Sequence, residues 1–350
     1  MFEKIIYQDL VNIFSNKNIN WDKLYCKKFL ITGANGFIAG YLIKLLIFLN
    51  INKKFKIKIF LITRNKKKVK KKFINNKTKK FITILETDLN KKFKVSKKVD
   101  YVLHTASNAS PKNYKKFPLE TLEPNVLGTY NLLSYAEKFK IKSFIFFSSG
   151  EVYGNSRNAV LKEEKIFDFN PLSLRAAYVE GKKIAETLCY SYFKQKKVPI
   201  KILRVFHTYG PMMNLNDGRV MMDFIKNVVN EKDIIIKSKG DQKRTFCYIS
   251  DLIEGLLIVL LKGKNGEAYN LANNTEYYSI SKLANLISKF TKNKNVIFKS
   301  RSKKDSYLVS PFNKVYPSIN KIKKLGFEPK IDIKNGYKRT IDYYKNIKLN

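Results

Sequence analysis

The chain has 350 residues, of which 44% are hydrophobic, and a formal net charge of +41. A chain of this length and composition can bury one large core or two adjacent cores. Its three cysteines are far apart, and His104 and His207 are its only histidines. This pattern argues against a zinc site, a disulfide framework and a Ser-His-Asp enzyme, and we expect no metal.

The high positive charge raises nucleic acid as a partner, and residues 66–72 (KKKVKKK) form a local basic run. Lysine is nevertheless spread through the whole chain beside abundant Asn and Ile, which is typical of the codon bias of an AT-rich genome. We therefore expect a solvated lysine surface and no nucleic-acid partner. Arginine, whose rigid fork suits phosphate, is retained despite this bias at Arg64, Arg157, Arg175, Arg204, Arg219, Arg244, Arg301 and Arg339.

No basic segment followed by an apolar stretch and a cleavage site opens the sequence. The most apolar run, residues 37–49, contains Lys44 and is too short to cross a membrane. We therefore expect a cytoplasmic protein that has no membrane partner.

Residues 1–28 form a predicted N-terminal helical extension, an amphipathic helix followed by a connector, before the first strand. From residue 28 on, short β-branched or aromatic runs alternate with longer helical segments, which predicts an α/β fold with a doubly wound parallel sheet. The expected strands are residues 29–32, 58–63, 81–85, 101–105, 143–148 and 200–206, and the expected helices are residues 37–50, residues 119–138 and one around Tyr178.

From about residue 208 this pattern fades into short mixed elements, which predicts a smaller α/β lobe. We assign residues 29–206, with a return near 245–262, to the cofactor-binding core. Residues 207–244 and 263–350 are assigned to the smaller lobe.

The segment LITGANGFIAG (residues 30–40) places glycines directly after a strand and at the start of an apolar helix. Gly33 allows a tight turn, and Gly36 lets the backbone approach a pyrophosphate at the helix N-terminus. The small side chain of Ala39, where a third glycine is usual, lets the helix pack on the strand. This context predicts a Rossmann dinucleotide site.

The second expected strand ends in Thr63, Arg64 and Asn65. An NAD-preferring site would show Asp or Glu there, to bind the ribose hydroxyls. Because no acid is present and Arg64 can hold a 2′-phosphate, the sequence favours NADP, with NAD as the alternative.

Two further segments carry groups for proton transfer. Tyr178 and Lys182 lie four residues apart and share one helix face, and a fixed lysine cation favours the phenolate that acts as a base. Ser149 and Glu151 follow the expected strand 143–148, so they emerge at the carboxyl edge of the sheet, where ligands bind. Ser149 can share the proton of a substrate hydroxyl with Tyr178, and Glu151 can be a second acid or base.

Together these features resemble the extended short-chain dehydrogenase/reductase family of nucleotide-sugar enzymes, over residues 29–345. The motifs are most similar to those of its UDP-glucuronate decarboxylase branch. They are HTASNASP (104–111), NVLGT (125–129), SGEVYG (149–154), EGK (180–182), RVFHTYGP (204–211), NDGRV (216–220) and RTFCYISD (244–251).

The resemblance implies an NAD(P) cofactor, a nucleotide-diphosphate sugar as substrate, a smaller lobe that binds this substrate, and a homodimer built on the helices that begin near Leu119 and Ala176. The implied catalytic residues are Ser149, Tyr178 and Lys182, for hydride chemistry at sugar C4, and Glu151, for the later step. The implied cofactor-binding residues are Gly33, Asn35, Gly36, Phe37, Ile38, Arg64, Asp88, Leu89, Thr105, Ala106, Ser107, Asn125, Tyr178 and Lys182. The implied substrate-binding residues are Ser110, Ser149, Glu151, His207, Arg219 and Arg244, the last two directed toward the diphosphate.

The chain departs from this branch at His207, where an asparagine is usual, and at Thr63 and Arg64, which replace an acidic ribose ligand. Its N-terminal extension is also unlike the shorter relatives.

The first step implied by the resemblance is oxidation of C4 to a ketone, in which Tyr178 takes the hydroxyl proton. If C6 is a carboxylate, the product is a β-keto acid that loses carbon dioxide. If C6 carries a hydroxyl, water can leave instead, with Glu151 as base. Dehydratases of the dTDP-glucose type carry Asp before that Glu, where this chain has Gly150. GDP-mannose dehydratases, however, use a Thr-Ser-Glu arrangement and NADP, so dehydration is weakened but stays open.

We rank decarboxylation or 4,6-dehydration first, and 4-epimerisation or NADPH-dependent reduction of a 4-keto sugar behind them. A non-catalytic NAD(P)-binding regulator is the alternative from another class of protein.

Overall fold

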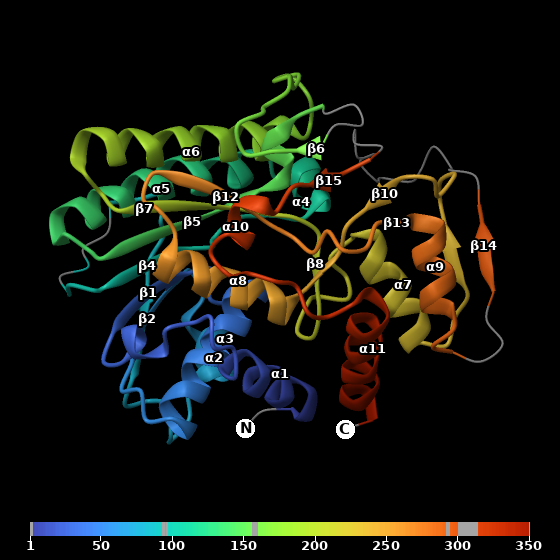
Figure 1. Cartoon of the computed structure of the whole chain (residues 1–350), viewed down its shortest axis with the longest axis horizontal. Helices are drawn as coiled ribbons and strands as arrows, with labels where there is room; N and C mark the ends of the chain where they lie inside the picture. The colour runs from blue at the N-terminus through green and yellow to red at the C-terminus, as the bar shows by residue number, and fades with distance from the viewer. Residues whose placement is uncertain are drawn as a thin grey trace.

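The computed structural model describes residues 3–349 except 93–94, 96, 156–159, 292–294 and 300–313. Arg157 and Arg301 therefore lie outside the described residues. Within them, seven strands pair in parallel into one sheet (Figure 1), namely β1 (Lys28–Thr32), β2 (Lys58–Thr63), β3 (Ile82–Glu86), β4 (Tyr101–His104), β5 (Ser143–Ser149), β7 (Ile200–Val205) and β12 (Glu267–Leu271).

The strands lie in the order β12-β7-β5-β4-β1-β2-β3. The chain starts in the middle of the sheet, builds outward through β2 and β3, and then returns to add β4, β5 and β7 on the other side of β1. Ligands of such sheets bind beyond the carboxyl ends of the strands where this order reverses, which here is between β1 and β4.

Helices cover both faces of the sheet (Figure 1). On one face, α5 (Leu119–Phe139) and α6 (Ala176–Lys196) pack on an apolar cluster that includes Phe144, Phe146 and Cys189. On the other face lie α2 (Phe37–Asn52) and α8 (Ile249–Lys262), with α1 (Lys4–Phe14) packed against α8. Because both faces are covered, the central strands are apolar on both sides.

The remaining elements of the sheet region are short. The basic run 66–72 lies in α3 (Lys66–Phe73), which is capped by the Asn65 side chain and buries Val69 and Phe73. The others are the 3₁₀ helices η1 (Trp21–Leu24) and η2 (Gly150–Tyr153), the helices α4 (Pro111–Lys116) and α10 (Asn320–Lys323), and the paired strands β6 (Val160–Leu161) and β15 (Tyr316–Pro317).

A smaller group of elements lies at one end of the sheet, at the right of Figure 1. Its helices are α7 (Val220–Val229), α9 (Ile280–Ser288) and α11 (Ile333–Leu349). Its strands form the pairs β8 (Thr208–Tyr209) with β11 (Cys247–Tyr248), β9 (Ile234–Ile236) with β14 (Val296–Phe298), and β10 (Lys243–Arg244) with β13 (Tyr278–Ser279).

The predicted α/β class and the doubly wound parallel sheet are confirmed, and each of the six expected strands is present. The sheet has one strand more than expected. Residues 263–350 were assigned to the smaller lobe, whereas β12 pairs with β7 at the edge of the main sheet, so this boundary is corrected to a point after β12. The remaining division into core and lobe stays a prediction.

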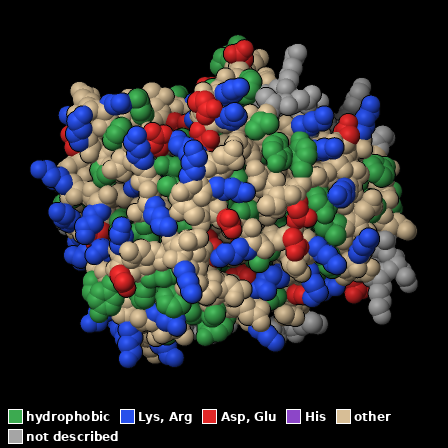
Figure 2. All heavy atoms as spheres, in the orientation of Figure 1, with side chains coloured by type: hydrophobic (Ala, Val, Ile, Leu, Met, Phe, Trp, Pro, Cys, Tyr) green, Lys and Arg blue, Asp and Glu red, His purple; other side chains and the backbone are tan. Residues whose placement is uncertain are grey.

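The lysine and arginine side chains are distributed over the face seen in Figure 2, interspersed with apolar and acidic residues. Among the described residues, no helix combines the length and the apolar character needed to cross a membrane.

Candidate active site

A cavity of about 400 Å³ lies at the carboxyl edge of the sheet, between its strand ends and the loops of the smaller group of elements. This is the place where doubly wound sheets bind ligands. The structure brings most of the predicted site residues together in its lining: Gly33, Gly36, Phe37, Ile38, Thr105, Ser107, Ser110, Ser149, Glu151, Tyr178, Lys182, His207, Arg219 and Arg244.

The turn after β1 leaves room for a ligand because of its glycines. Gly33 has φ +68°, and a Cβ there would lie 2.9 Å from the Thr105 hydroxyl oxygen. The Gly36 amide donates to the Gly33 carbonyl over 2.8 Å, and α2 starts directly afterwards without a side-chain cap. The first amides of α2 therefore lie beside the cavity, where a helix N-terminus favours anions.

Two predicted cofactor residues near this turn carry unpaired buried polar atoms. The Asn35 amide donates to Thr63 over 3.3 Å, while its Oδ1 has no partner among the described residues. The Ser107 hydroxyl, in the cavity lining, likewise has no partner among them. Buried polar atoms are usually satisfied, so these two atoms are available to a bound molecule.

Five further predicted cofactor residues, Ala106, Arg64, Asp88, Leu89 and Asn125, do not line the cavity. Ala106 donates its amide to the Thr32 hydroxyl over 3.0 Å. Arg64 is exposed after β2, and Asp88 accepts the amide of Asn90. Leu89 and Asn125 are buried, and they lie against Gly128 and Gly181 respectively, at the packing contacts of α5.

Tyr178 and Lys182 are buried on the first turns of α6. The Lys182 ammonium donates to the Phe147 carbonyl over 2.6 Å and lies 5.9 Å from the centroid of the Tyr178 ring. Burial lowers the pKa of Lys182 to about 7. Burial also raises the pKa of Tyr178, while its hydrogen bond with the Ser149 hydroxyl opposes the rise. The Ser149 hydroxyl thus favours the phenolate of Tyr178.

Glu151 follows β5 in the short helix η2, and its amide donates to the Ser149 hydroxyl over 3.2 Å. Its carboxylate forms an ion pair with the buried Arg175, which directly precedes α6. Between Ser149 and Glu151, a Cβ on Gly150 would lie 2.5 Å from the Phe206 ring. This loop therefore has no space for a side chain at residue 150.

Tyr114 of α4 joins these groups. Its ring stacks on that of Tyr178 with the centroids 4.6 Å apart, and the Arg175 guanidinium lies 5.7 Å from the Tyr114 centroid. Neither Tyr114 nor Arg175 was predicted as a site residue. Arg175 could have been found as one of the few retained arginines, whereas no local pattern indicates Tyr114.

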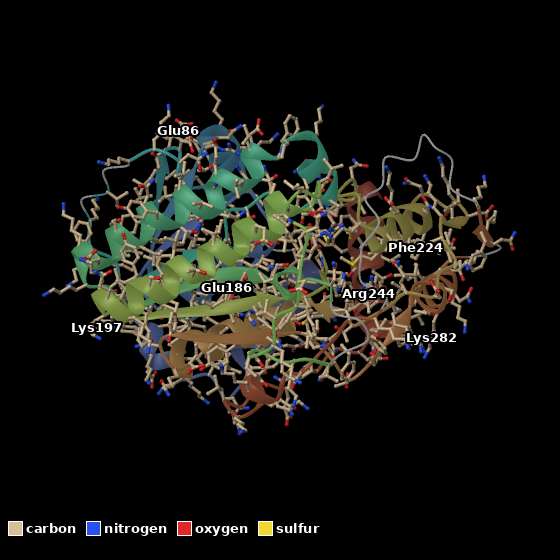
Figure 3. All side chains as sticks on the ribbon, turned by 90° about the horizontal axis from the view of Figure 1, so that it is seen from above. Glu86, Glu186, Lys197, Phe224, Arg244 and Lys282 are labelled. Atoms are coloured by element: carbon tan, nitrogen blue, oxygen red, sulfur yellow. The ribbon has the colours of Figure 1, made fainter. Side chains whose placement is uncertain are left out.

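Three arginines, Arg175, Arg219 and Arg244, bring positive charge to the lining of the cavity. Arg244 is buried, and Figure 3 shows it between Glu186 of α6 and Phe224 of α7 in that view. Burial, together with the charges of Arg244, Arg219 and Arg175, lowers the pKa of His207 to about 3. His207 is therefore neutral near pH 7, and the arginines around it create a potential that favours anionic ligands.

Arg219 has an acidic neighbour inside this cavity. Its Nε lies 2.8 Å from Asp217 Oδ1, and its Nη2 donates to the Ala109 carbonyl over 3.3 Å. The Ser110 hydroxyl donates to the Asp217 carbonyl over 2.6 Å, which ties the loop after β4 to the loop before α7.

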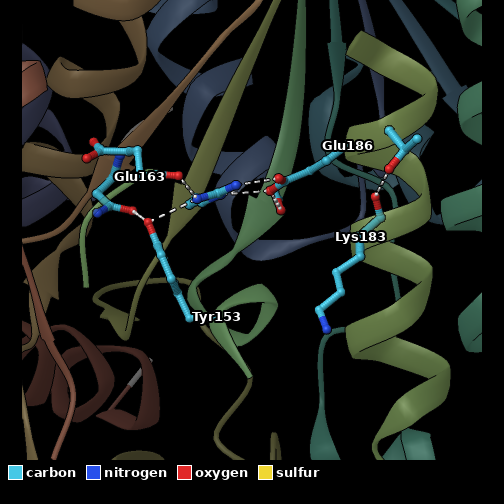
Figure 4. Close-up of polar contacts among 8 residues, drawn as sticks. Tyr153, Glu163, Lys183 and Glu186 are labelled. Atoms are coloured by element: carbon cyan, nitrogen blue, oxygen red, sulfur yellow. Dashed lines mark hydrogen bonds and ion pairs between the residues drawn. The ribbon is translucent and has the colours of Figure 1, made fainter. Parts of the chain in front are cut away.

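A buried network behind the cavity fixes the end of β5 against α6. Arg204 donates to both carboxylate oxygens of Glu186, over 3.0 and 2.7 Å, and to the Tyr153 hydroxyl over 3.1 Å. Figure 4 shows Glu186 and Tyr153 on opposite sides of this guanidinium. The Ser148 hydroxyl donates to Glu186 over 2.5 Å. Bidentate pairing of this kind sets the geometry of the strand end that carries Ser149.

The model of the NAD-dependent epimerase/dehydratase family matches residues 29–272, which is more than half of the chain. The chain belongs to the NAD-dependent epimerase/dehydratase family. The resemblance seen in the motifs is thereby confirmed.

Relatives of this epimerase/dehydratase chain include UDP-glucuronic acid decarboxylases. The one named decarboxylase 1 in Xenopus tropicalis is 37% identical over 249 residues, covering 71% of this chain and 57% of that protein. The one named decarboxylase 6 in Arabidopsis thaliana is 36% identical over 239 residues, covering 68% of this chain and 67% of that protein. The chain thus spans little more than half the length of the Xenopus relative.

Solved structures share the fold of this epimerase/dehydratase chain. UDP-glucuronic acid 4-epimerase from Bacillus cereus, in complex with UDP-glucuronic acid and NAD, aligns with a TM-score of 0.74 and 24% identity, covering 91% of this chain and 99% of that chain. UDP-glucose 4-epimerase from Thermotoga maritima, with UDP-glucose, aligns with a TM-score of 0.77 and 22% identity, covering 92% and 100%. At these identities the likeness shows the fold.

Within this family member, the described residues contain no group of three or more His, Cys, Asp or Glu side chains that could hold a metal ion. The groups that line the cavity can instead transfer protons and bind anions. Tyr178, Ser149 and Glu151 line the same cavity as Arg219 and Arg244, and the Arg219 charge opposes the rise in the pKa of Tyr178. This arrangement suits an anionic ligand that carries a reactive hydroxyl.

Proposed function

We propose that this chain oxidises C4 of a UDP-glucuronate-like nucleotide sugar with bound NAD(P) and then releases the C6 carboxylate as carbon dioxide. The observation that carries the proposal is the ion pair between Glu151 and Arg175 beside Tyr178 in one cavity. It places a phenol for the C4 hydroxyl beside a guanidinium that balances the Glu151 charge, so that this carboxylate repels a sugar acid less. The relatives named UDP-glucuronic acid decarboxylase support the choice of substrate.

The residues present fit a dinucleotide cofactor. The space at Gly33 and the open N-terminus of α2 suit a pyrophosphate, and the unpaired atoms of Asn35 and Ser107 suit polar groups of the cofactor. In the proposed site Gly33, Gly36, Phe37 and Ile38 hold the pyrophosphate. A nicotinamide bound there would supply the acceptor and then the donor of the C4 hydride.

In the proposed first step, Tyr178 removes the proton of the C4 hydroxyl, and the hydrogen bond from Ser149 stabilises the phenolate. Lys182 is buried close enough to Tyr178 to add a positive charge. The same tyrosine returns the proton at the end of the cycle. At C4, one proton and one hydride are therefore removed and then restored.

In the proposed second step, the electron pair of the C5–C6 bond moves toward the C4 ketone, and carbon dioxide leaves. The enolate that remains then takes a proton from water at C5, so that one solvent proton is consumed for each carbon dioxide released. Such a β-keto acid needs little acid catalysis, so positioning of the carboxylate is the main task of the protein. We assign that task to Arg175, Glu151 and Tyr114.

Gly150 favours decarboxylation over dehydration. Removal of water from C6 requires an acid beside the leaving hydroxyl, and dehydratases of the dTDP-glucose type carry Asp at this position. Here the Phe206 ring occupies the space of any side chain at residue 150. The Glu151 carboxylate, which would be the base in dehydration, is paired with Arg175.

We propose NADP as the preferred form of the cofactor. Arg64 is exposed at the end of β2 and no acid stands at residues 63–65, so a 2′-phosphate would meet a cation. Titration of the protein with NADP and with NAD tests this choice. We expect Arg64→Gln to weaken NADP binding and to leave NAD binding unchanged, and equal losses for both would contradict it.

We further propose a homodimer through α5 and α6. Both helices expose large apolar side chains, Leu127 and Tyr130 on α5 and Ile184 and Tyr190 on α6. The mass measured by light scattering would be that of two chains, and Tyr130→Asp would lower it to one. A single-chain mass for the unaltered protein would contradict the proposal. A cytoplasmic location stays a prediction.

The test of the reaction is incubation of the purified protein with UDP-glucuronate and with UDP-, dTDP-, GDP- and CDP-hexoses, each with NAD or NADP. The masses of the products decide between the candidates. Loss of carbon dioxide from UDP-glucuronate supports the proposal, and loss of water, gain of two hydrogens or an unchanged mass with altered NMR couplings indicates dehydration, reduction or epimerisation. No change in any sugar would contradict enzymatic function.

A further inference from the structure

The N-terminal helix α1 carries a buried carboxylate with three donors. Asp9 is 1% exposed, and its Oδ2 accepts from the Tyr41 hydroxyl over 2.5 Å and from the Tyr248 hydroxyl over 2.8 Å. Its Oδ1 accepts from Arg339 Nη2 over 2.5 Å. Asp9 lies outside residues 29–272, which match the family.

Each donor comes from a different element. Tyr41 lies on α2, the helix whose N-terminus forms the cofactor end of the cavity. Tyr248 lies on β11, and Arg339 lies on α11. A carboxylate is buried at high cost unless its partners are in place, so Asp9 constrains all three elements together.

Tyr248 lies in a pair of strands, β8 and β11, that carries part of the cavity lining. β11 pairs with β8, and the Cys247 amide donates to the His207 carbonyl over 2.8 Å. His207 and Phe246, which flank these two strands, both line the cavity, with ring centroids 5.9 Å apart. The position of β11 therefore determines the positions of the His207 and Phe246 rings in the cavity lining.

Arg339 belongs to α11, which also contacts the pair of strands β8 and β11. Tyr337, two residues before it, stacks on Tyr209 of β8 with the centroids 4.0 Å apart and the planes 11° from parallel. The pair of strands β8 and β11 is thus held from α1 through Tyr248 and from α11 through Tyr337.

We propose that Asp9 is a positioning residue through which the N-terminal helix fixes the β8–β11 wall of the cavity relative to α2. This role is separate from the proposed reaction, because it concerns where the wall stands and not which ligand the cavity takes. The extension thereby joins the two sides of the cavity, α2 on the cofactor side and β11 on the other.

Amide hydrogen exchange tests this role without any ligand. In Asp9→Asn, at least one of the three donors loses its acceptor, and we expect the Cys247 amide and its neighbours in β8 and β11 to exchange about tenfold faster. Exchange in β4 stays unchanged. Glu3→Gln is the matched control, because it removes another contact between the start of α1 and α2, the ion pair of Glu3 with Lys44 at 2.8 Å.

Tyr248→Phe keeps the ring and removes only the hydroxyl that contacts Asp9, so it carries the same test if Asp9→Asn does not fold. We expect it to accelerate exchange in β8 and β11 as Asp9→Asn does. Unchanged exchange at Cys247 in the folded variants, or equal acceleration throughout the sheet, would overturn the proposal.

Calorimetric titration with UDP adds a second readout. We expect Asp9→Asn to weaken UDP binding several-fold, Glu3→Gln to leave it unchanged, and the double variant Asp9→Asn with Tyr248→Phe to be no weaker than the single ones, because both act on one contact. If the losses of UDP affinity in the two single variants added up in the double variant, the two residues would not act through one contact. Failure of the unaltered protein to bind UDP counts against the proposed substrate, and the exchange result then decides the role of Asp9.

Discussion

The ring of Tyr114 stacks on that of Tyr178 with the centroids 4.6 Å apart and the planes 13° from parallel. On Tyr114 also lies the guanidinium of Arg175, which is ion-paired with Glu151. These contacts connect the phenol proposed to act at C4 with the carboxylate proposed to act afterwards. A displacement of any one of these groups would therefore alter both steps.

Loss of the stacking ring would lower turnover more than binding. Tyr114→Leu removes the stack that orients Tyr178, and we expect kcat to fall about tenfold or more with little change in KM. Tyr114→Phe keeps the stack but removes the hydroxyl, which donates to the Ala109 carbonyl over 2.9 Å and also forms a hydrogen bond with Tyr178. It should therefore lose less activity than Tyr114→Leu. Equal kcat values for both variants would contradict an orienting role.

Arg175 should be needed for turnover of a sugar acid. Arg175→Met leaves the Glu151 carboxylate without its cation, and we expect kcat/KM for UDP-glucuronate to fall about a hundredfold. Arg175→Lys keeps the charge without the planar fork and should retain part of the activity. Lys183→Met is the control, because it removes a cation of α6 that is paired with Glu180 over 3.0 Å. A similar loss in the control would refute a specific role for Arg175.

Asp217 should weaken the binding of nucleotide diphosphates. Its carboxylate lines the cavity 2.8 Å from the Arg219 Nε and opposes an anionic ligand. We therefore expect Asp217→Asn to bind UDP about three- to tenfold more tightly in low salt, with a smaller gain as salt rises. Asp223→Asn makes the same change of charge outside the cavity lining and should have little effect. Weaker UDP binding by Asp217→Asn would show that its charge is needed.

Asp251 should make stability depend on pH. Burial raises the pKa of this carboxyl from 3.8 to about 7, opposed by the backbone amide of Ile331 and increased by the charge of Glu254. The folded state thus binds the proton more tightly than the unfolded chain. The stabilisation that Asp251 contributes is therefore fully present below pH 3.8, and it is lost as the pH rises through about 7.

Urea unfolding at a series of pH values measures this dependence. We expect the free energy of unfolding of Asp251→Asn to fall less than that of the unaltered protein over the same interval. Asp22→Asn, at an exposed position in η1, should follow the unaltered protein. Parallel curves for Asp251→Asn and the unaltered protein would show that Asp251 does not titrate in this range.

The elements with a strong local pattern could be predicted from the sequence. The buried strands are short β-branched runs, and the glycines after β1 and the pair Tyr178–Lys182 follow rules of spacing within a few residues. β12 was not expected because its sequence, EAYNL, lacks such a run and is recruited by pairing with β7. The sequence of the basic run in α3 predicts a solvated surface, whereas one face of this helix is buried through Val69 and Phe73.

Contacts between distant segments could not be predicted. Tyr114 and Tyr178 meet because α4 and α6 converge at the cavity, and Arg175 reaches Glu151 from a different loop. The stabilisation of Tyr178 by Lys182 also stays a prediction; the lysine donates to the Phe147 carbonyl. The role of Asn125 stays a prediction; its amide donates to the Thr121 carbonyl within α5.

The most direct measurement uses UDP-glucuronate labelled with deuterium at C4. If the hydride removed from C4 is returned to the same carbon, the product will have lost one carbon dioxide and kept its deuterium at C4, with no net consumption of NAD(P). Tyr178→Phe, which keeps the ring of Tyr178 stacked on Tyr114, should form almost none of this product. A product that keeps the carboxylate, or formation of the decarboxylated sugar by Tyr178→Phe at the unaltered rate, would contradict oxidation at C4 as the first step of a decarboxylation.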